Sequence, residues 1–196
     1  MRKLIAGRST KGLHNLALTI ASLCFAIFAV FVIPVMADLP PVVQVLASAI
    51  SLAGIVAAVE YLLVWLRAKD VLGEWVYYSS SGNWARVHIG ISSGALTYKA
   101  QLYRTKAHLE ASSDLWAVGE GSMVEYEGGN LYIRYEVKLT SPDYVPRDGF
   151  LTMVPDILDR RRMTGFWSRT SETGSGDQRG TLTISRDIPA TDFSHG

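Results

Sequence analysis

Two long apolar runs near the N-terminus constrain this chain more than any other feature. Residues 16–36 read LALTIASLCFAIFAVFVIPVM, which is twenty-one residues without a single charge. Residues 42–66 form a second apolar run, in which Glu60 is the only charged residue. At a rise of about 1.5 Å per residue, a helix of either length can cross a hydrocarbon core of roughly 30 Å.

The first run has a second interpretation, because it follows the basic stretch MRKLIAGRSTK and could be the core of a signal peptide. It is longer than the roughly 7–15 apolar residues of such a core, and another span follows closely. We therefore expect a two-helix transmembrane hairpin over residues 1–69, with spans at about 16–36 and 42–66. A tight turn is expected at 37–41, where an aspartate and two prolines lie.

The distribution of charge predicts the orientation of this hairpin. Residues 1–69 carry six basic and two acidic residues (6 − 2 = +4), and the connecting loop holds only Asp38. The positive-inside rule then places both termini and everything after residue 69 in the cytoplasm, so we expect a multi-pass membrane protein. The lone Cys24 fits a reducing compartment and excludes a disulfide framework.

Small residues recur three or four positions apart on one face of the second span. Such spacing lets two helix backbones approach closely, either within the hairpin or between protomers. The predicted membrane or oligomer contact consists of Ala47, Ser51, Gly54 and Ala58.

From residue 73 onward the apolar pattern changes to two-residue alternation, interrupted by Gly, Ser and Asn. This pattern predicts an all-β cytoplasmic domain over residues 70–190, followed by a tail at 191–196. Short, evenly spaced strands are typical of an up-and-down (meander) small β-barrel, in which closure removes exposed edges. We expect eight strands, at about 73–80, 83–92, 95–107, 114–126, 130–140, 149–155, 162–170 and 179–187.

Two expected hairpin turns fix the pairing of their strands. A two-residue turn at Ser93-Gly94 places an apolar set, including Tyr98, on one face and a polar set on the other. The same arithmetic at Gly128-Gly129 places Glu120 on the apolar face opposite Val137. Glu120 is then expected either to pair with an interior arginine or to lie at a wet end of the barrel.

The sequence lacks the motifs that mark most kinds of catalytic site. The chain has no GxxxxGK[ST], GxGxxG, HExxH or GxSxG motif, and its four histidines are scattered. We expect neither an enzymatic activity nor a metal site. The net charge of residues 70–196, thirteen basic against sixteen acidic (13 − 16 = −3), argues against binding to long nucleic acid.

Aromatic and arginine residues are abundant in the expected barrel. Rings stack on nucleobases and guanidinium groups bind phosphates, although aromatic residues are also common in strands that only fill a core. The run Arg160-Arg161-Arg162 is a solvated turn, or else contacts lipid headgroups or a ligand phosphate. The candidate ligand-binding residues are Trp84, Arg86, Tyr103, Tyr77, Arg104, Trp167, Arg169 and Arg186.

The two spans, the opening Gly73-Glu74-Trp75, the segment GFWS at 165–168 and the closing GTLTIS at 180–185 resemble one known family. This is the two-transmembrane, β-strand-rich effector family of bacterial anti-phage signalling by cyclic oligonucleotides (CBASS). The resemblance implies a defence effector of the inner membrane whose barrel binds a cyclic dinucleotide made by a partner nucleotidyltransferase. Binding would trigger homo-oligomerisation and disruption of the lipid bilayer, without a cofactor.

Two other functions remain open at this point. The Gly-x-Trp opening also resembles that of lipocalin-like barrels, which hold an apolar small molecule. Alternatively, the chain is a membrane scaffold that has no ligand.

Overall fold

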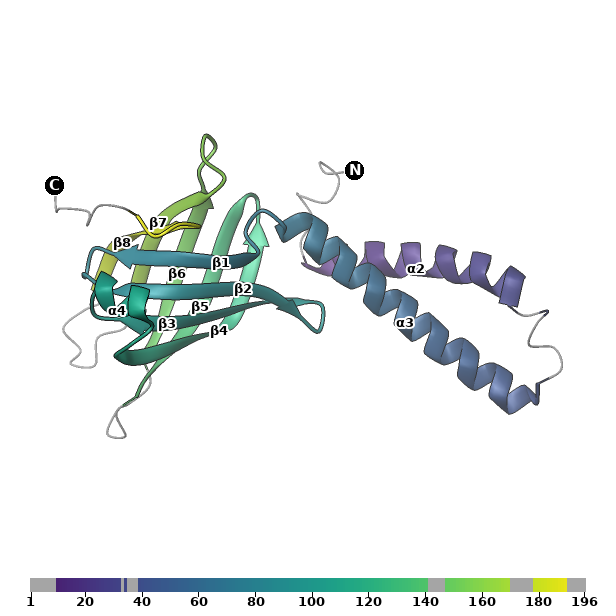
Figure 1. Ribbon diagram of the computed structural model, residues 1–196. Helices are drawn as coiled ribbons and strands as arrows, with labels where there is room; N and C mark the ends of the chain where they lie inside the picture. The colour runs from purple at the N-terminus through teal and green to yellow at the C-terminus, as the bar shows by residue number, and fades with distance from the viewer. Residues whose placement is uncertain (1–9, 33, 35–38, 141–146, 170–177, 190–196) are drawn as a thin grey trace. The chain divides into compact units, whose positions relative to one another are not determined.

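The computed structural model describes residues 10–32, 34, 39–140, 147–169 and 178–189. Along the chain, two long helices precede eight strands, with a short helix between the third and fourth strands (Figure 1). The described residues fall into two compact units. The first contains the long helices as far as Arg67 together with the turn at 93–95, and the second contains the other described residues from Ala68 onward. Each unit is described by itself.

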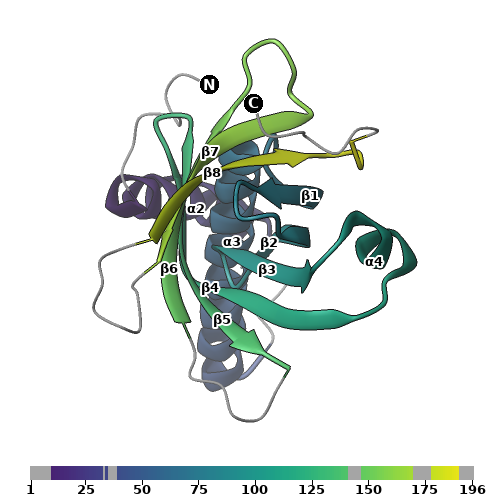
Figure 2. The same ribbon diagram turned by 90° about the vertical axis from the view of Figure 1, so that its left-hand side faces the viewer.

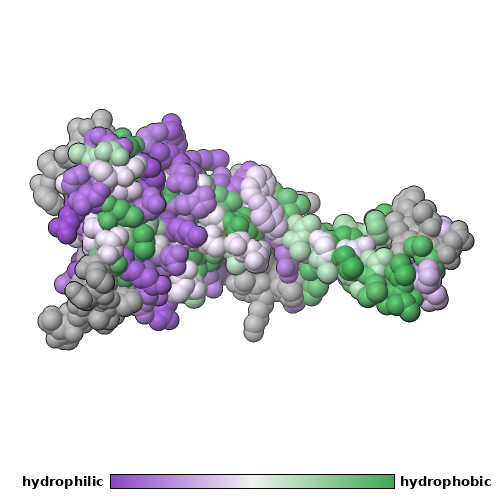
Figure 3. Space-filling view, turned by 60° about the horizontal axis from the view of Figure 1, so that its bottom comes forward, coloured by the Kyte–Doolittle hydropathy of each residue, from purple (hydrophilic) through white to green (hydrophobic). Residues whose placement is uncertain are grey.

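The two long helices are α2 (Thr10–Val32) and α3 (Pro41–Ala68). Of the described residues, only α3 forms a helix long and apolar enough to cross a membrane, since the apolar part described in α2 is shorter, Asn15–Val30. Figure 3 shows apolar residues predominating on the helices and hydrophilic residues on the barrel face in view. One helix is therefore long and apolar enough to span a membrane, whereas the two-span hairpin stays a prediction.

The expected turn at 37–41 is only partly visible, because residues 37 and 38 lie outside the described chain. Pro41 is the first residue of α3, where a missing N–H costs nothing. The carbonyl oxygen of Pro40 accepts hydrogen bonds from the backbone N–H of Val43 (2.9 Å) and Gln44 (3.1 Å). The second proline thus starts the helix.

Within the helical unit, Ala17 on α2 and Leu63 on α3 are buried in a small cluster with Val59 and Leu66. In the predicted small-residue contact, the Ser51 hydroxyl donates to the carbonyl oxygen of Ala47 on its own helix. Gly54 and Ala58, from the same set, are exposed. The face of α3 that carries Gly54 and Ala58 therefore differs from the face of α3 that meets α2.

The eight strands form a closed antiparallel barrel in sequence order, which confirms the predicted meander (Figure 2). Closure comes from β8 pairing with β1, where Val76 lies opposite Ser185. The strands are β1 (Gly73–Ser79), β2 (Trp84–Ser92), β3 (Ala95–Tyr103), β4 (Leu115–Glu127), β5 (Asn130–Leu139), β6 (Arg147–Pro155), β7 (Arg162–Arg169) and β8 (Gln178–Ser185).

The expected strand at 95–107 is too long at its C-terminal end. β3 stops at Tyr103, and the six-residue helix α4 (Lys106–Ala111) follows. Thr105 caps this helix by accepting the backbone N–H of His108, and Ser112 ends it in a left-handed conformation. So short a helix carries too little apolar periodicity to be recognised in a sequence.

The predicted position of Glu120 is also wrong. β4 and β5 pair as expected from their turn to Met123 opposite Arg134, but a bulge at Ser122 then shifts the register by one residue. Glu120 consequently lies opposite Glu136, with its side chain exposed on the outer face. The extra residue reverses the inward and outward alternation of the strand beyond it.

Alternate residues of every strand fill the barrel interior. Its fully buried side chains include Trp75, Ile89, Ile133, Met153 and Ile184, which lie on five different strands. These residues belong to one cluster that extends to Ala68 and Val71, just before β1. The interior is therefore a packed core over part of its length rather than an open channel.

Candidate ligand-binding site

The two ends of the barrel differ in how they are closed. In an antiparallel meander, the starts of odd strands and the ends of even strands share one end. We call this the tether end, because residues 69–72 join β1 to α3 there. The opposite end, which includes the β1–β2 turn at 80–83, is called the far end.

The indole ring of Trp75 and the guanidinium of Arg186 close the tether end. The indole N–H of Trp75 donates to the carbonyl oxygen of Val71 (2.8 Å), and the guanidinium of Arg186 lies 3.7 Å from the centre of the Trp75 ring. Arg186 also donates to the carbonyl oxygens of Asp70, Leu72 and Glu74. The arginine therefore binds the backbone of the connection and the first strand, and it has little capacity left for a ligand.

The far end holds a cavity of about 120 Å³ inside the barrel. Space is available because inward positions there carry small residues, including Ala85, Ala100 and Gly119. The remaining lining is mainly aromatic and apolar, with an arginine and two polar residues of the β1–β2 turn. It comprises Tyr77, Ser81, Asn83, Tyr98, Leu102, Trp116, Tyr135, Val137, Leu139, Leu151, Trp167 and Arg169.

Two glycines hold rings of this cavity in place. A Cβ added at Gly149 would lie 2.4 Å from the phenol oxygen of Tyr135, and one at Gly180 would lie 2.5 Å from the indole nitrogen of Trp167. Each ring therefore lies directly against the backbone of a glycine, where the side chain of any other residue type would clash with the ring. This close approach fixes the orientation of both rings before any ligand arrives.

The indole nitrogens of Trp116 and Trp167 are buried and lack a hydrogen-bond partner among the described residues. A buried polar group without a partner costs free energy, so most such groups in folded proteins are paired. Both donors belong to rings that line one cavity.

Three phenols of the cavity are kept neutral. Burial raises the pKa of Tyr77 and Tyr135 above the ordinary value of 10.0, and raises that of Tyr98 well above it. The positive charge of Arg169 acts in the opposite direction on Tyr77 and Tyr135 but is the smaller effect. At neutral pH the cavity thus offers hydroxyl groups rather than phenolate charges.

Among the described residues of this lining, Arg169 supplies the only positive charge. It lies at the end of β7, half-buried, with its guanidinium 5.9 Å from the centre of the Trp167 ring. Its Nε donates to the side-chain oxygen of Gln178 on β8 (2.7 Å). An arginine beside an aromatic wall is suited to a phosphate or carboxylate attached to a planar ring.

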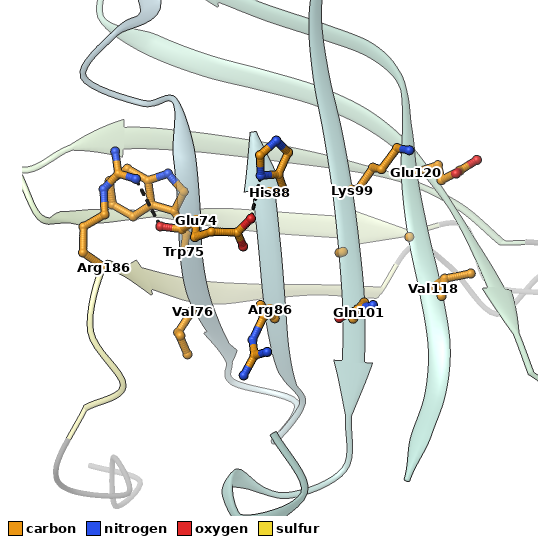
Figure 4. Close-up of a pocket in the computed structure, with 12 residues that line it drawn as sticks. Glu74, Trp75, Val76, Arg86, His88, Lys99, Gln101, Val118, Glu120 and Arg186 are labelled. Atoms are coloured by element: carbon orange, nitrogen blue, oxygen red, sulfur yellow. Dashed lines mark hydrogen bonds and ion pairs between the residues drawn. The ribbon is translucent and has the colours of Figure 1, made fainter. Parts of the chain in front are cut away.

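A second hollow lies on the outer face of β1–β4 (Figure 4). It is larger, about 740 Å³, and it is lined by charges of both signs, including Arg86, Lys99 and Glu120. His88 and Glu74 are cross-strand neighbours in its lining and bind each other, with Nδ1 and Oε1 2.6 Å apart. The imidazole of His88 is the exposed ring of this lining and is already engaged with Glu74, so the cavity at the far end is the stronger candidate site.

The structure separates the predicted ligand residues into groups. Tyr77, Trp167 and Arg169 come together in the far-end cavity, whereas Arg186 lies at the tether end. Arg104 is exposed just after β3.

Trp84, Arg86 and Tyr103 occupy the outer face, where they support α4. Trp84 and Tyr103 are buried in a cluster with Leu109 of that helix, and Arg86 donates to the Ser112 hydroxyl and the Leu109 carbonyl oxygen. Their polar and aromatic atoms are therefore engaged in holding α4 on the barrel.

Tyr98, Tyr135 and Trp116 line the cavity but were not among the predicted ligand residues. For Tyr98 a signal existed, because the turn at Ser93-Gly94 already placed this phenol on an otherwise apolar face. Tyr135 had a signal as well, because it alternates with Leu131 and Ile133 along β5 and so shares their inward face.

The fold and the cavity define a closed eight-stranded meander barrel with a small aromatic site at one end. No protein-family model and no curated protein matches the chain. A solved structure described as "Structure of EF1p2_mFAP2b bound to DFHBI" is similar with a TM-score of 0.37 and 10% identical residues, covering 61% of this chain and 96% of that one. A similarity so distant does not bear on function.

Proposed function

We propose that this chain is a membrane-anchored receptor whose barrel binds a small ligand in the cavity at the far end. The observation that carries the proposal is the pair of buried, unpartnered indole N–H groups of Trp116 and Trp167 in one preformed aromatic cavity. α3, which is long and apolar enough to cross a membrane, supplies the anchor. The site offers recognition groups and no nucleophile with a positioned base, so we propose a binding role rather than catalysis.

For the ligand, we propose a cyclic dinucleotide, in agreement with the anti-phage effector family that the sequence resembles. The cavity of about 120 Å³ is smaller than the roughly 300–1,000 Å³ of a typical small-molecule site. One nucleobase would therefore enter between the rings and accept from the indole N–H groups. The phosphates would stay at the mouth, within reach of Arg169.

The response to the ligand is proposed to be assembly in the bacterial inner membrane. A ligand that binds the assembled form better than the monomer shifts the population toward assembly. The exposed face of α3 that carries Gly54 and Ala58 is suited to contact between protomers. Disruption of the bilayer, and death of the infected cell, would follow.

An apolar small molecule is the second candidate ligand, favoured by the mainly apolar lining of the cavity. A thermal-shift screen of the full chain in mild detergent, with cyclic di- and trinucleotides in one arm and fatty acids in the other, separates the two. A ligand at 100 times its Kd stabilises the folded state by about 2.7 kcal/mol. Stabilisation by fatty acids alone would refute the cyclic nucleotide, and no stabilisation in either arm would favour a ligand-free scaffold.

A matched pair of variants locates the site. Arg169→Gln removes the charge at the cavity mouth and is expected to weaken nucleotide binding about tenfold or more, since hydrogen bonds to charged groups contribute about 1.5–3 kcal/mol. Arg179→Gln makes the same change on the exposed face of the neighbouring strand and should leave the affinity unchanged. Equal affinities in titration calorimetry would remove Arg169 from the site.

A further inference from the structure

The loop between β6 and β7, residues 156–161, displays two large apolar side chains to solvent. Ile157 is 93% exposed and Leu158 is 96% exposed, the highest values among the large apolar residues of the described chain. Neither contributes to the barrel core. Two adjacent apolar side chains at the tip of a loop suit insertion into a partner rather than support of the fold.

The backbone of the loop is held in a fixed form by its own aspartates. Oδ1 of Asp156 accepts the backbone N–H of Leu158 (2.8 Å) and that of Asp159 (3.3 Å). Oδ1 of Asp159 accepts the N–H of Arg161 (2.9 Å), and the N–H of Asp156 donates to the carbonyl oxygen of Arg162 (2.9 Å). The apolar pair is thus presented by a constrained turn.

Two exposed arginines follow the apolar pair after one residue, Asp159. Arg160 and Arg161 are both exposed, and Arg161 contacts Asp187 through Nη2 and Oδ1 at 2.7 Å. Apolar side chains beside guanidinium groups match the interfacial region of an anionic bilayer, where acyl chains lie beneath phosphates.

The topology places this loop at the tether end. β6 ends at Pro155 and β7 begins at Arg162, so residues 156–161 share an end with residues 69–72. The backbone N–H of Arg186, whose side chain binds the tether carbonyls, donates to the carbonyl oxygen of Arg161 (2.9 Å). Four tether residues extend at most about 14 Å, so a membrane-spanning α3 keeps this end close to the bilayer.

We propose that residues 156–161 form a membrane-docking loop. Ile157 and Leu158 enter the headgroup region of an anionic bilayer, and Arg160 and Arg161 contact lipid phosphates. The loop then acts with the tether as a second point of attachment and fixes the orientation of the barrel, with the far-end cavity pointing into the solution. The inference rests on the membrane anchoring proposed above for α3, but not on the identity of the ligand.

The test uses the full chain reconstituted into phosphatidylcholine vesicles with and without phosphatidylglycerol. Cys24 is replaced by Ser, and an environment-sensitive NBD label is attached at Ile157→Cys or, as a matched control, at Ser113→Cys, an exposed position at the far end. We expect the label at 157 to shift its emission to the blue, to be quenched by doxyl-labelled lipid and to be shielded from iodide. The label at 113 should show none of these effects.

Two further variants test whether the apolar side chain and the arginines each contribute to the contact with the bilayer. Leu158→Asp should reduce the quenching by doxyl lipid at position 157 severalfold, and Arg160→Glu with Arg161→Glu should remove the dependence on phosphatidylglycerol. If the label at 157 is as open to iodide as the label at 113, docking is refuted. Shielding that rises with the protein-to-lipid ratio would also refute it, because a second copy of the chain would then be the occupant.

Failure of docking and failure of the proposed function are distinguishable. Flotation of the chain with the vesicles reports the anchor, and titration with cyclic dinucleotides reports the receptor. A chain that floats and binds its ligand, but whose label at 157 stays exposed, overturns only the docking loop. A chain that does not float overturns the anchor and the docking loop together.

Discussion

Arg186 should contribute more to the stability of the barrel than any other exposed or half-exposed arginine of the described chain. Its guanidinium lies 3.7 Å from the centre of the Trp75 ring and donates to three backbone carbonyls. Burial lowers the pKa of this arginine, and the nearby charge of Arg161 lowers it further, although it stays charged at neutral pH. We expect Arg186→Met to be folded but markedly destabilised.

The magnitude follows from the contacts. A cation over an aromatic ring contributes about 0.5–2 kcal/mol, with the higher values where the pair is desolvated. A hydrogen bond in a folded protein contributes about 0.5–1.5 kcal/mol net, and here the lower figure applies because water reaches part of the side chain. The ring and the three carbonyls together give a loss of roughly 2–4 kcal/mol in the free energy of unfolding.

Urea unfolding of the full chain in mild detergent, followed by near-UV circular dichroism, measures this loss. Arg179→Met is the matched control, because Arg179 is exposed on β8, the strand that Arg186 directly follows. Arg186→Lys should fall between the two, since an ammonium group keeps the charge but cannot stack flat on Trp75 or bind several carbonyls at once. If Arg186→Met and Arg179→Met unfold within about 0.5 kcal/mol of each other, the assigned role of Arg186 is wrong.

Four other outcomes are expected. Glu120→Gln should change the free energy of unfolding by less than about 0.5 kcal/mol in urea titrations, because the bulge places this carboxylate on the surface; a large gain would mean that it is buried. Gly180→Ala should push the Trp167 ring into the cavity and weaken ligand binding in calorimetry while the barrel stays folded. Above about pH 10 the barrel should lose stability, because unfolded phenols release protons that the buried ones keep, and Tyr98→Phe should make that loss less steep in urea titrations at several pH values. Ser93→Asn should stabilise the β2–β3 turn by a few tenths of a kcal/mol, since Asn tolerates the observed φ of 50° better than Ser.

The barrel could be predicted because each of its strands shows two signals at once. Alternation of apolar and polar residues marks the strand, and Gly, Ser or Asn marks the turn, as at Ser93-Gly94, where both residues have positive φ. The bulge at Ser122 gives no such signal, because the residues around it are compatible with either register. A single extra residue therefore moved Glu120 to the outer face and placed Gly121, rather than Ser122, opposite Tyr135.

The burial of outward-facing residues could not be predicted from the sequence, for a different reason. Trp84 and Tyr103 alternate with inward residues exactly as solvent-facing residues do, yet both are buried. The element that covers them, α4, is held by tertiary contacts such as that of Leu109 rather than by its own helix propensity. Local pattern thus separated the inside of the barrel from the outside, but it could not show which part of the outside is covered.

The proposed ligand site and the membrane attachment lie at opposite ends of the barrel, and this separation limits how a signal can pass between them. Between the ends lies a core of fully buried side chains, including Ile133, Met153 and Ile184, inside a closed hydrogen-bonded ring of strands. Cores packed in this way resist small continuous deformations. Under the proposed function, a ligand at the far end would therefore act most directly by changing the surface that another protomer meets at that end. The helices would then respond to the number of neighbouring protomers rather than to a displacement transmitted through the barrel.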